Sequence, residues 1–364
     1  MKLAQIVSIL EETVPALWQE DYDNSGLIVG DPQMDVSKAL VCVDVTQSVF
    51  DEAVRRNCDL IIAHHPLVFK GLKRLTPGSR TESLVIQAIK KDIAVYALHT
   101  NLDNMDKGVS WALGQKIGLK TSQVLVPRKG LLRKLVTFCP VDHAEQVRQA
   151  LFDAGAGCIG NYDSCSYNLE GTGSFRAGEG SHPFVGETGK THFENELRIE
   201  TVYPLHLEHE IVRALLNAHP YEEVAYDLYP LENEYAKVGS GVIGDLESPL
   251  DEAEFLDLLK SISGSVVLRH SALLGRHVSK VAICGGSGSF LIREAIARKA
   301  DVFITADLKY HDFFEAGRKI LLADIGHYES EQFAKELIAA ILVKKIPTFA
   351  VLMTENNTNA VYYH

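Results

Sequence analysis

The chain has 364 residues, which is long for a single hydrophobic core and predicts at least two domains. Its 46% apolar and 23% charged residues are typical of a soluble globular protein, and no run reaches the roughly 18 apolar residues of a membrane span. A formal net charge of −12 disfavours nucleic acid as a partner, because the phosphodiester backbone would be repelled. Six scattered cysteines without a CxxC pair indicate a reducing compartment, so we expect a cytoplasmic protein without a membrane partner.

Strands and helices alternate at both ends of the sequence. Six apolar runs predict strands, at residues 39–44, 60–63, 93–98, 281–284, 302–305 and 320–325. Four segments with apolar residues at helical spacing predict helices, at residues 48–56, 82–91, 289–299 and 331–342. Such alternation predicts an α/β fold with largely parallel sheets that are covered on both faces.

The two ends also resemble each other. The segments that start at Val36 and Val278 share Val-Ser-Lys followed by apolar residues and a cysteine, Cys42 or Cys284, and each begins three strands in similar order. We therefore predict an outer domain made of two related α/β halves that meet around one site.

The middle of the chain has a different pattern, which predicts an inserted α+β domain over 129–235 and a discontinuous outer domain over 1–128 and 236–364. Its expected elements are a strand at 134–139, a helix at 144–154, a Gly-rich stretch at 171–189, a strand at 196–203, a helix at 208–218 and a strand at 225–229. This order is typical of ferredoxin-like domains. We expect the loop at 178–183 to be mobile, because it is rich in turn-forming residues.

Metal-type ligands follow three predicted strands of the outer domain. His64 and His65 end the second strand, and two further groups, His99 with Asp103 and His327 with Glu331, follow later strands. The carboxyl ends of parallel strands meet at one sheet edge, so these side chains can converge. Imidazole and carboxylate ligands together suit zinc, manganese or iron, and a bridging carboxylate points to two divalent ions per chain. The nucleophile of such a site is a metal-bound water rather than a side chain.

Several neighbouring residues leave alternatives open. His99 is either a ligand or a residue that orients Asp103. Asp307 and His311 follow the strand that matches the one before His64; they either add polar groups to the pocket, or His311 begins the next helix. Gly-Gly-Ser-Gly-Ser at 285–289 is either a phosphate cradle or a tight turn, and it lacks a dinucleotide fingerprint.

His219-Pro-Tyr-Glu-Glu223 is a compact polar cluster in the insert. Proline beside a helix end is ordinary turn chemistry, which favours a structural role for this cluster. A role in binding an effector or a second metal is the alternative.

Five motifs of the outer domain resemble those of the Nif-three-like dinuclear metal-centre family, whose members are labelled GTP cyclohydrolase I type 2 homologues. They are Asp23-Asn-Ser-Gly-Leu27, Ile62-Ala-His-His-Pro66, His99-Thr-Asn-Leu-Asp103, Thr305-Ala-Asp-Leu-Lys-Tyr-His311 and Gly326-His-Tyr-Glu-Ser-Glu331. The resemblance covers residues 1–128 and 236–364. The insert resembles the PII-like domain of longer family members, which is similar to divalent-cation-tolerance proteins.

The resemblance implies one ion held by His65, Asp103 and Glu331, and a second held by His64, His327 and the shared Glu331. It also implies a toroidal homohexamer. The expected function is metal-dependent hydrolysis of a small molecule, such as the nucleotide GTP, by a metal-bound hydroxide. The alternative is a non-catalytic regulatory or metal-handling protein whose insert senses a small molecule.

Overall fold

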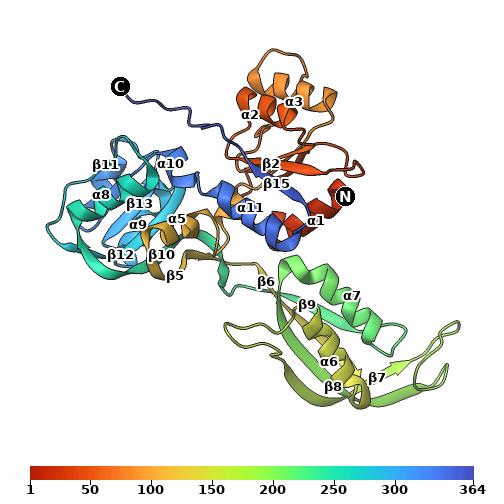
Figure 1. The fold of residues 1–364 in the computed structure, drawn as a ribbon. Coiled ribbons are helices and arrows are strands. Elements are labelled where there is room, and N and C mark those ends of the chain that lie inside the picture. The colour runs from red at the N-terminus through yellow and green to blue at the C-terminus, as the bar shows by residue number, and fades with distance from the viewer. The chain divides into compact units, whose positions relative to one another are not determined.

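The structure, a computed structural model, describes residues 1–364 and divides into two compact units (Figure 1). Unit 1 combines Met1–Pro127 with Ala236–His364, and unit 2 is Arg128–Tyr235. No helix has the length and apolar character that a bilayer span requires.

The first sheet of unit 1 has five strands in the order β1-β4-β3-β2-β15. Their bounds are Gly26–Val29 (β1), Lys38–Cys42 (β2), Leu60–Ala63 (β3), Ala94–Ala97 (β4) and Ala350–Met353 (β15). All neighbours are parallel except β1, which pairs antiparallel with β4. Because β2, β3 and β4 are buried on both faces, their sequences are continuous apolar runs rather than alternating ones.

Helices cover both faces of this sheet. The helices α2 (Gln47–Arg55) and α3 (Arg80–Lys90) pack on one face, and α1 (Leu3–Thr13) and α11 (Ala334–Lys345) pack on the other (Figure 1). Alternate strand residues supply the two cores: Ile61 belongs to the α2 and α3 side, and Leu60 to the α1 and α11 side.

The second sheet of unit 1 has six strands in the order β11-β14-β13-β12-β10-β5. Their bounds are Leu119–Arg128 (β5), Tyr235–Asp251 (β10), Arg269–His270 (β11), His277–Ser287 (β12), Val302–Ala306 (β13) and Leu321–Asp324 (β14). The strands β12, β13 and β14 are parallel and lie in the same spatial order as β2, β3 and β4. The predicted α/β fold is therefore confirmed, with a largely parallel first sheet and a parallel centre in the second, where β10 and β11 pair antiparallel with β12 and β14.

The helices α5 (Val109–Ile117) and α8 (Glu252–Ser263) pack on one face of the second sheet, and α9 (Ile292–Ala297) packs on the other. Two short helices, α4 (Thr100–Asp103) and α10 (His327–Glu331), follow β4 and β14. Two predicted helices differ from the structure. The 289–299 segment begins with a 3-10 turn over Ser289–Leu291, and the 331–342 helix begins only at Ala334, after α10.

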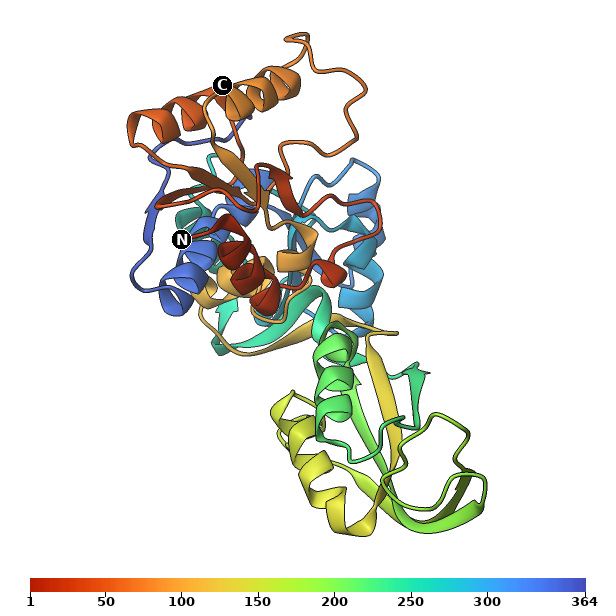
Figure 2. The same ribbon diagram turned by 90° about the vertical axis from the view of Figure 1, so that its right-hand side faces the viewer.

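Unit 2 has the element order β6 (Leu132–Pro140), α6 (Ala144–Asp153), β7 (Tyr167–Arg176), β8 (Thr191–Pro204), α7 (Glu208–Ala218) and β9 (Tyr226–Leu231). The strands form an antiparallel sheet in the order β7-β8-β6-β9, and this βαββαβ arrangement is ferredoxin-like. Figure 2 shows α6 in yellow and α7 in green, side by side on one face of the strands.

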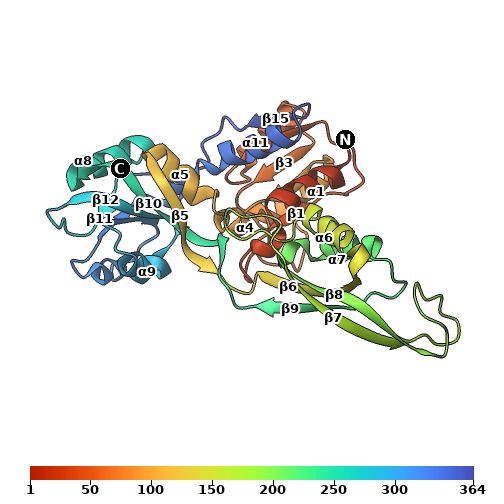
Figure 3. The ribbon, with the colours of Figure 1, turned by 90° about the horizontal axis from the view of Figure 1, so that it is seen from below.

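The strand β7 was not expected, because its glycines Gly171 and Gly173 weaken local strand propensity. The pairing with β8 overrides that propensity and runs from Tyr167 to Arg176. The pairing of β6 with β8 stops at Glu196. Beyond it, the last residues of β7 and the first residues of β8 continue as a two-stranded ribbon (Figure 3).

Candidate metal centre

His64 and His65 follow β3 directly. The backbone N–H of His64 donates to the carbonyl of Cys42 at 3.1 Å, and that of His65 donates to the carbonyl of Val43 at 2.9 Å. The backbone is therefore fixed by pairing beyond the last strand residue, and both imidazoles stand at the carboxyl end of the first sheet. His64 is completely buried, whereas His65 is partly exposed.

The remaining expected ligands lie on the two short helices. Asp103 is the last residue of α4, while His327 and Glu331 are the first and last residues of α10. The four-residue spacing brings His327 and Glu331 onto one face of α10. The centre thus draws its side chains from both sheets of unit 1.

Glu331 lies at the middle of this cluster. Its Oε2 is 2.9 Å from His65 Nε2, 3.0 Å from His327 Nε2 and 3.9 Å from His64 Nε2. The Nε2 atoms of His65 and His327 are 3.4 Å apart. A carboxylate surrounded by three imidazole nitrogens has the position of a ligand that bridges two ions.

Two atoms of the cluster are buried without any hydrogen-bond partner, His64 Nε2 and Asp103 Oδ1. They lie 3.6 Å apart, which is too long for a hydrogen bond. Ligand atoms around one tetrahedral zinc ion, each 2.0–2.2 Å from it, are separated by about 3.4 Å. Because unpaired buried polar atoms are costly, this pair fits a divalent metal that would join them.

The distances favour a division of the ligands that differs from the one implied by the family resemblance. His64 lies beside Asp103, and His65 lies beside His327, with Glu331 between the two pairs. The resemblance implies the opposite pairing of the two adjacent histidines. A motif does not decide this point, because consecutive rings at a strand end can turn to either side.

Each imidazole in the centre uses its Nδ1–H to hold its orientation. That atom donates to the carbonyl of Leu98 at 2.8 Å in His64, to Asp44 at 2.8 Å in His65, and to Asp307 at 2.6 Å in His327. The Nε2 atom of every ring is consequently the one that faces Glu331. This arrangement of an oxygen acceptor behind each imidazole is the usual support of metal-binding histidines.

The carboxylates and imidazoles of the cluster change one another's pKa values. Burial disfavours a charged imidazole, but hydrogen bonds to Asp44 and Glu331 outweigh it and raise the pKa of His65 to about 10. Burial likewise opposes ionisation of Glu331, yet the surrounding histidines hold the pKa of its carboxyl well below the usual value. Burial raises the pKa of Asp103. The centre therefore places anionic and cationic groups together in a poorly hydrated space.

Gly286 makes room for the bridging position. Its φ is +64°, and a Cβ at this residue would lie 2.2 Å from Glu331 Oε1. The backbone N–H groups of Gly285 and Gly286 donate to the hydroxyls of Ser110 and Ser330, at 3.0 and 2.9 Å. These two N–H groups are thus already used within the protein, and the absence of a side chain at Gly286 leaves the space that the Glu331 carboxylate occupies.

Two cavities border the centre. One, of about 470 Å³, is lined by His99, Asp103 and Glu331 together with the aromatic rings of Tyr22 and Phe290. The other, of about 740 Å³, is lined by His65 and by the C-terminal segment 357–363. His327 lines both cavities, so a small molecule in either one would lie against the ligand cluster.

The other expected site residues have different places. His99 donates from Nδ1 to Asp23 at 2.6 Å, so its hydrogen bond does not orient Asp103. Asp307 holds His327 and also accepts from the Ser287 hydroxyl. His311 precedes the 3-10 helix Asp312–Ala316 and lines neither cavity, in agreement with the alternative that it begins that helix.

The chain resembles known proteins over most of its length. A protein-family model described as Duf34/NIF3 (NGG1p interacting factor 3) matches residues 1–360. The chain belongs to the Duf34/NIF3 family. A Bacillus subtilis relative named GTP cyclohydrolase 1 type 2 homolog is 39% identical over 334 residues, which cover 91% of this chain and 89% of that relative.

A Staphylococcus epidermidis relative of the same name is 32% identical over 367 residues, and the match covers 100% of this chain and 100% of that relative. The solved structure of a Bacillus cereus protein related to NIF3 has a TM-score of 0.88 at 35% identity and covers 100% of this chain and 99% of its own. The resemblance seen in the outer-domain motifs is thus confirmed as family membership.

Two residues of this Duf34/NIF3 centre were missed in the sequence. Asp44 orients His65, and Asp23 holds His99 while accepting the backbone N–H of Thr100 at 3.0 Å. Asp44 lies two residues beyond β2, so the strand-end rule that singled out His64 also applies to it. Asp23 lies in one of the five family motifs, although nothing in its local sequence reveals that it contacts His99.

Proposed function

We propose that this chain is a metal-dependent hydrolase with two divalent ions, zinc, manganese or iron, in the candidate centre. The observation that carries the proposal is the position of Glu331 between His65 and His327 on one side and the unpaired His64 and Asp103 atoms on the other. We assign His64 and Asp103 to one ion, His65 and His327 to the other, and Glu331 to both. Divalent ions bound here would lower the pKa of a coordinated water toward neutrality and supply the nucleophile for hydrolysis.

The protein's own part is to hold the ligands and to move a proton. Asp44, Asp307 and the Leu98 carbonyl fix the three ligand rings from behind, so little reorganisation is needed during the reaction. His99 lines the smaller cavity with its Nδ1 committed to Asp23. Its Nε2 is then the acceptor that would take a proton from the reacting molecule or from water.

For the substrate we propose a nucleotide such as GTP, hydrolysed at the imidazole ring of its guanine. The relatives' name supports this choice, and the smaller cavity offers Tyr22 and Phe290 as faces on which a flat ring can stack. The alternative, a regulatory or metal-handling protein, predicts metal binding with no turnover of GTP.

The test combines elemental analysis with an activity assay. Native protein should hold about two divalent ions per chain, and His64→Ala/His65→Ala should hold almost none. The matched control is His270→Ala/His277→Ala, which removes two exposed imidazoles from the same unit. Loss of the guanine absorbance of GTP should require the metal and disappear in the site variant alone. Unchanged metal content in that variant would refute the ligand assignment, while metal without turnover would favour the non-catalytic alternative.

We also propose, from family resemblance, that the chain acts in the cytoplasm as a toroidal homohexamer, and that unit 2 is a PII-like insert. Its βαββαβ order is compatible with that assignment. Analytical ultracentrifugation of the native chain should give the mass of six chains, and a monomer at all concentrations would contradict the assembly.

A further inference from the structure

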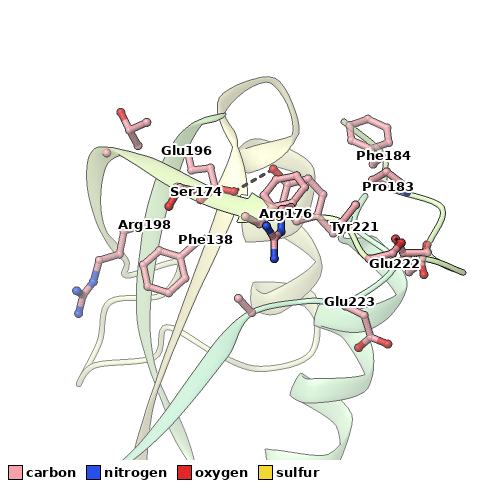
Figure 4. Close-up of a pocket in the computed structure, with 18 of the residues that line it drawn as sticks. Phe138, Ser174, Arg176, Pro183, Phe184, Glu196, Arg198, Tyr221, Glu222 and Glu223 are labelled. Carbon is pink, nitrogen blue, oxygen red and sulfur yellow. Dashed lines mark hydrogen bonds between the residues drawn. The ribbon is translucent and has the colours of Figure 1, made fainter. Parts of the chain in front are cut away.

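Unit 2 contains a pocket of about 770 Å³ that is separate from the candidate metal centre. The residues that form it come from β6, β7 and β8, from the connecting loop that includes Pro183 and Phe184, and from the segment Tyr221 to Ala225 after α7 (Figure 4). Its volume lies in the range of pockets that enclose small organic ligands, roughly 300–1,000 Å³.

The walls of this pocket are aromatic. Phe138, Phe175, Phe184 and Tyr221 all line it, and the Tyr221 ring lies 6.1 Å from that of Phe175 and 6.2 Å from that of Phe184, centroid to centroid. Arg198 lies over the face of Phe138, 5.9 Å from its ring centre. Aromatic faces arranged in this way favour a flat ring as the occupant, because such rings stack on one another.

A buried carboxylate faces this aromatic space. Glu196 is only 9% exposed, and its one hydrogen bond is with the Tyr221 hydroxyl, which donates to Oε1 at 2.9 Å (Figure 4). No Lys, Arg or His pairs with it, although a carboxylate can accept several hydrogen bonds. Burying a carboxylate with so few donors is costly unless another molecule supplies them.

The surroundings of Glu196 hold it in this position. A Cβ at Gly173 would lie 2.1 Å from Glu196 Oε2, so the glycine provides the space that the carboxylate occupies. His219 accepts the backbone N–H of Tyr221 at 3.1 Å and donates to the carbonyl of Phe138 at 2.9 Å. Burial and the neighbouring Glu196 raise the pKa of Tyr221, so its hydroxyl keeps its proton and donates it.

The two arginines that line the pocket differ in what they already bind. Arg198 pairs with Glu200 at 2.9 Å. Arg176 is exposed, and its side chain makes no hydrogen bond or ion pair. A guanidinium with five free donors is a suitable partner for a phosphate or carboxylate on the ligand.

We propose that unit 2 binds a flat nitrogen heterocycle that presents adjacent N–H donors to Glu196, as guanine does, and carries an anionic group for Arg176. An adenine ring fits less well, because its corresponding edge places an acceptor beside a donor and would turn a lone pair toward the carboxylate. The aromatic rings give the site its affinity for flat molecules, and Glu196 selects among them.

The test is isothermal titration calorimetry of the full chain with guanosine monophosphate, in the presence of EDTA so that no metal-bound contact contributes. Glu196→Gln keeps an acceptor for Tyr221 but loses the charge, and it should weaken binding by about 10- to 100-fold, as expected for a charge-assisted contact. Glu223→Gln is the matched control, because it removes the same charge from an exposed wall of the same pocket. That variant should bind within about twofold of native protein, as surface charges usually do.

Adenosine monophosphate should bind at least tenfold more weakly than guanosine monophosphate. Guanosine, which lacks the phosphate, should also bind more weakly, and its affinity should be the same for native protein and for Arg176→Ala. Circular dichroism should show that all variants keep the native fold. Equal affinity of Glu196→Gln and native protein, or no heat with guanosine monophosphate at millimolar concentration, would overturn the proposal. So would self-association of the native chain that Glu196→Gln abolishes, since a second copy would then fill the pocket. None of these outcomes depends on hydrolysis at the metal centre.

Discussion

Thr358 donates its hydroxyl hydrogen to Asp44 Oδ2 at 3.1 Å, while the other oxygen of Asp44 holds His65 Nδ1. Asn359 in turn donates to Glu329 Oε1 at 2.8 Å. The C-terminal segment is thus attached to a residue that orients a candidate ligand and to α10, and its position is coupled to the geometry of the centre.

Asp44→Asn should weaken the binding of divalent metal by about 10- to 100-fold, the usual effect of losing a carboxylate behind a metal-binding histidine. The amide removes the negative charge that raises the basicity of His65, and its NH₂ group can enforce the other tautomer. Competition with a chromophoric chelator measures this affinity. Asp35→Asn, at an exposed position, should leave it unchanged, and equal affinity in both variants would show that Asp44 has no such role.

Gly286→Ala should abolish metal loading in a folded protein, because the new Cβ would displace Glu331. The control is Gly264→Ala, which has a similar φ, +69° against +64°, but no atom within 4 Å of its Cβ position. Both variants should lose about 1–2 kcal/mol from the left-handed backbone. Elemental analysis should find metal in the control only, and a fully loaded Gly286→Ala protein would argue against the position of Glu331.

Glu52→Ala should lower the free energy of unfolding by about 1–3 kcal/mol, because several donors lose their acceptor. The buried Glu52 carboxylate accepts from the hydroxyl of Thr354, from Arg56, from the Glu355 backbone N–H and from the side chain of Asn356. Urea unfolding of metal-free protein followed by circular dichroism measures the change. The exposed substitution Glu12→Ala should shift the midpoint little, and equal midpoints for the two variants would contradict the expected role.

The same carboxylate predicts a dependence of stability on pH. Burial opposes its ionisation, but hydrogen bonds from Thr354 and Arg56 outweigh it and lower the pKa of Glu52 to about 2. Since the unfolded chain has the higher pKa, near 4.5, the stabilisation is complete above about pH 5 and disappears as the pH falls toward about 2. Glu52→Gln should flatten this part of the stability curve, and an identical acid dependence in both proteins would contradict it.

The sequence was most informative where structure is local. The strand 60–63 has the bounds that its apolar run predicted, and the metal-type residues after it lie where a strand-end site requires them. The sequence was least informative about pairings between distant residues. The strand β15 joins the first sheet beside β2, more than 300 residues earlier in the chain, and no local pattern announces that partner.

The candidate site shows the same limit. The sequence identifies His64 and His65 as candidate ligands, but which ring faces Asp103 depends on the contacts of Leu98 and Asp44 with the two Nδ1 atoms. Those contacts arise only when β2, β3 and β4 lie side by side. Residue type therefore predicts the chemistry, whereas the assembled sheet determines the geometry.

His65 and Glu331 are 266 positions apart in sequence yet 2.9 Å apart in space. An ion held by both would act as a cross-link between the two sheets of unit 1. Closing a loop of that length in the unfolded chain costs about 5 kcal/mol in free energy, because the chain loses conformational entropy. Metal occupancy would thus add to the contacts through which the two halves of the outer domain unfold together, a mechanical role beside the proposed chemistry.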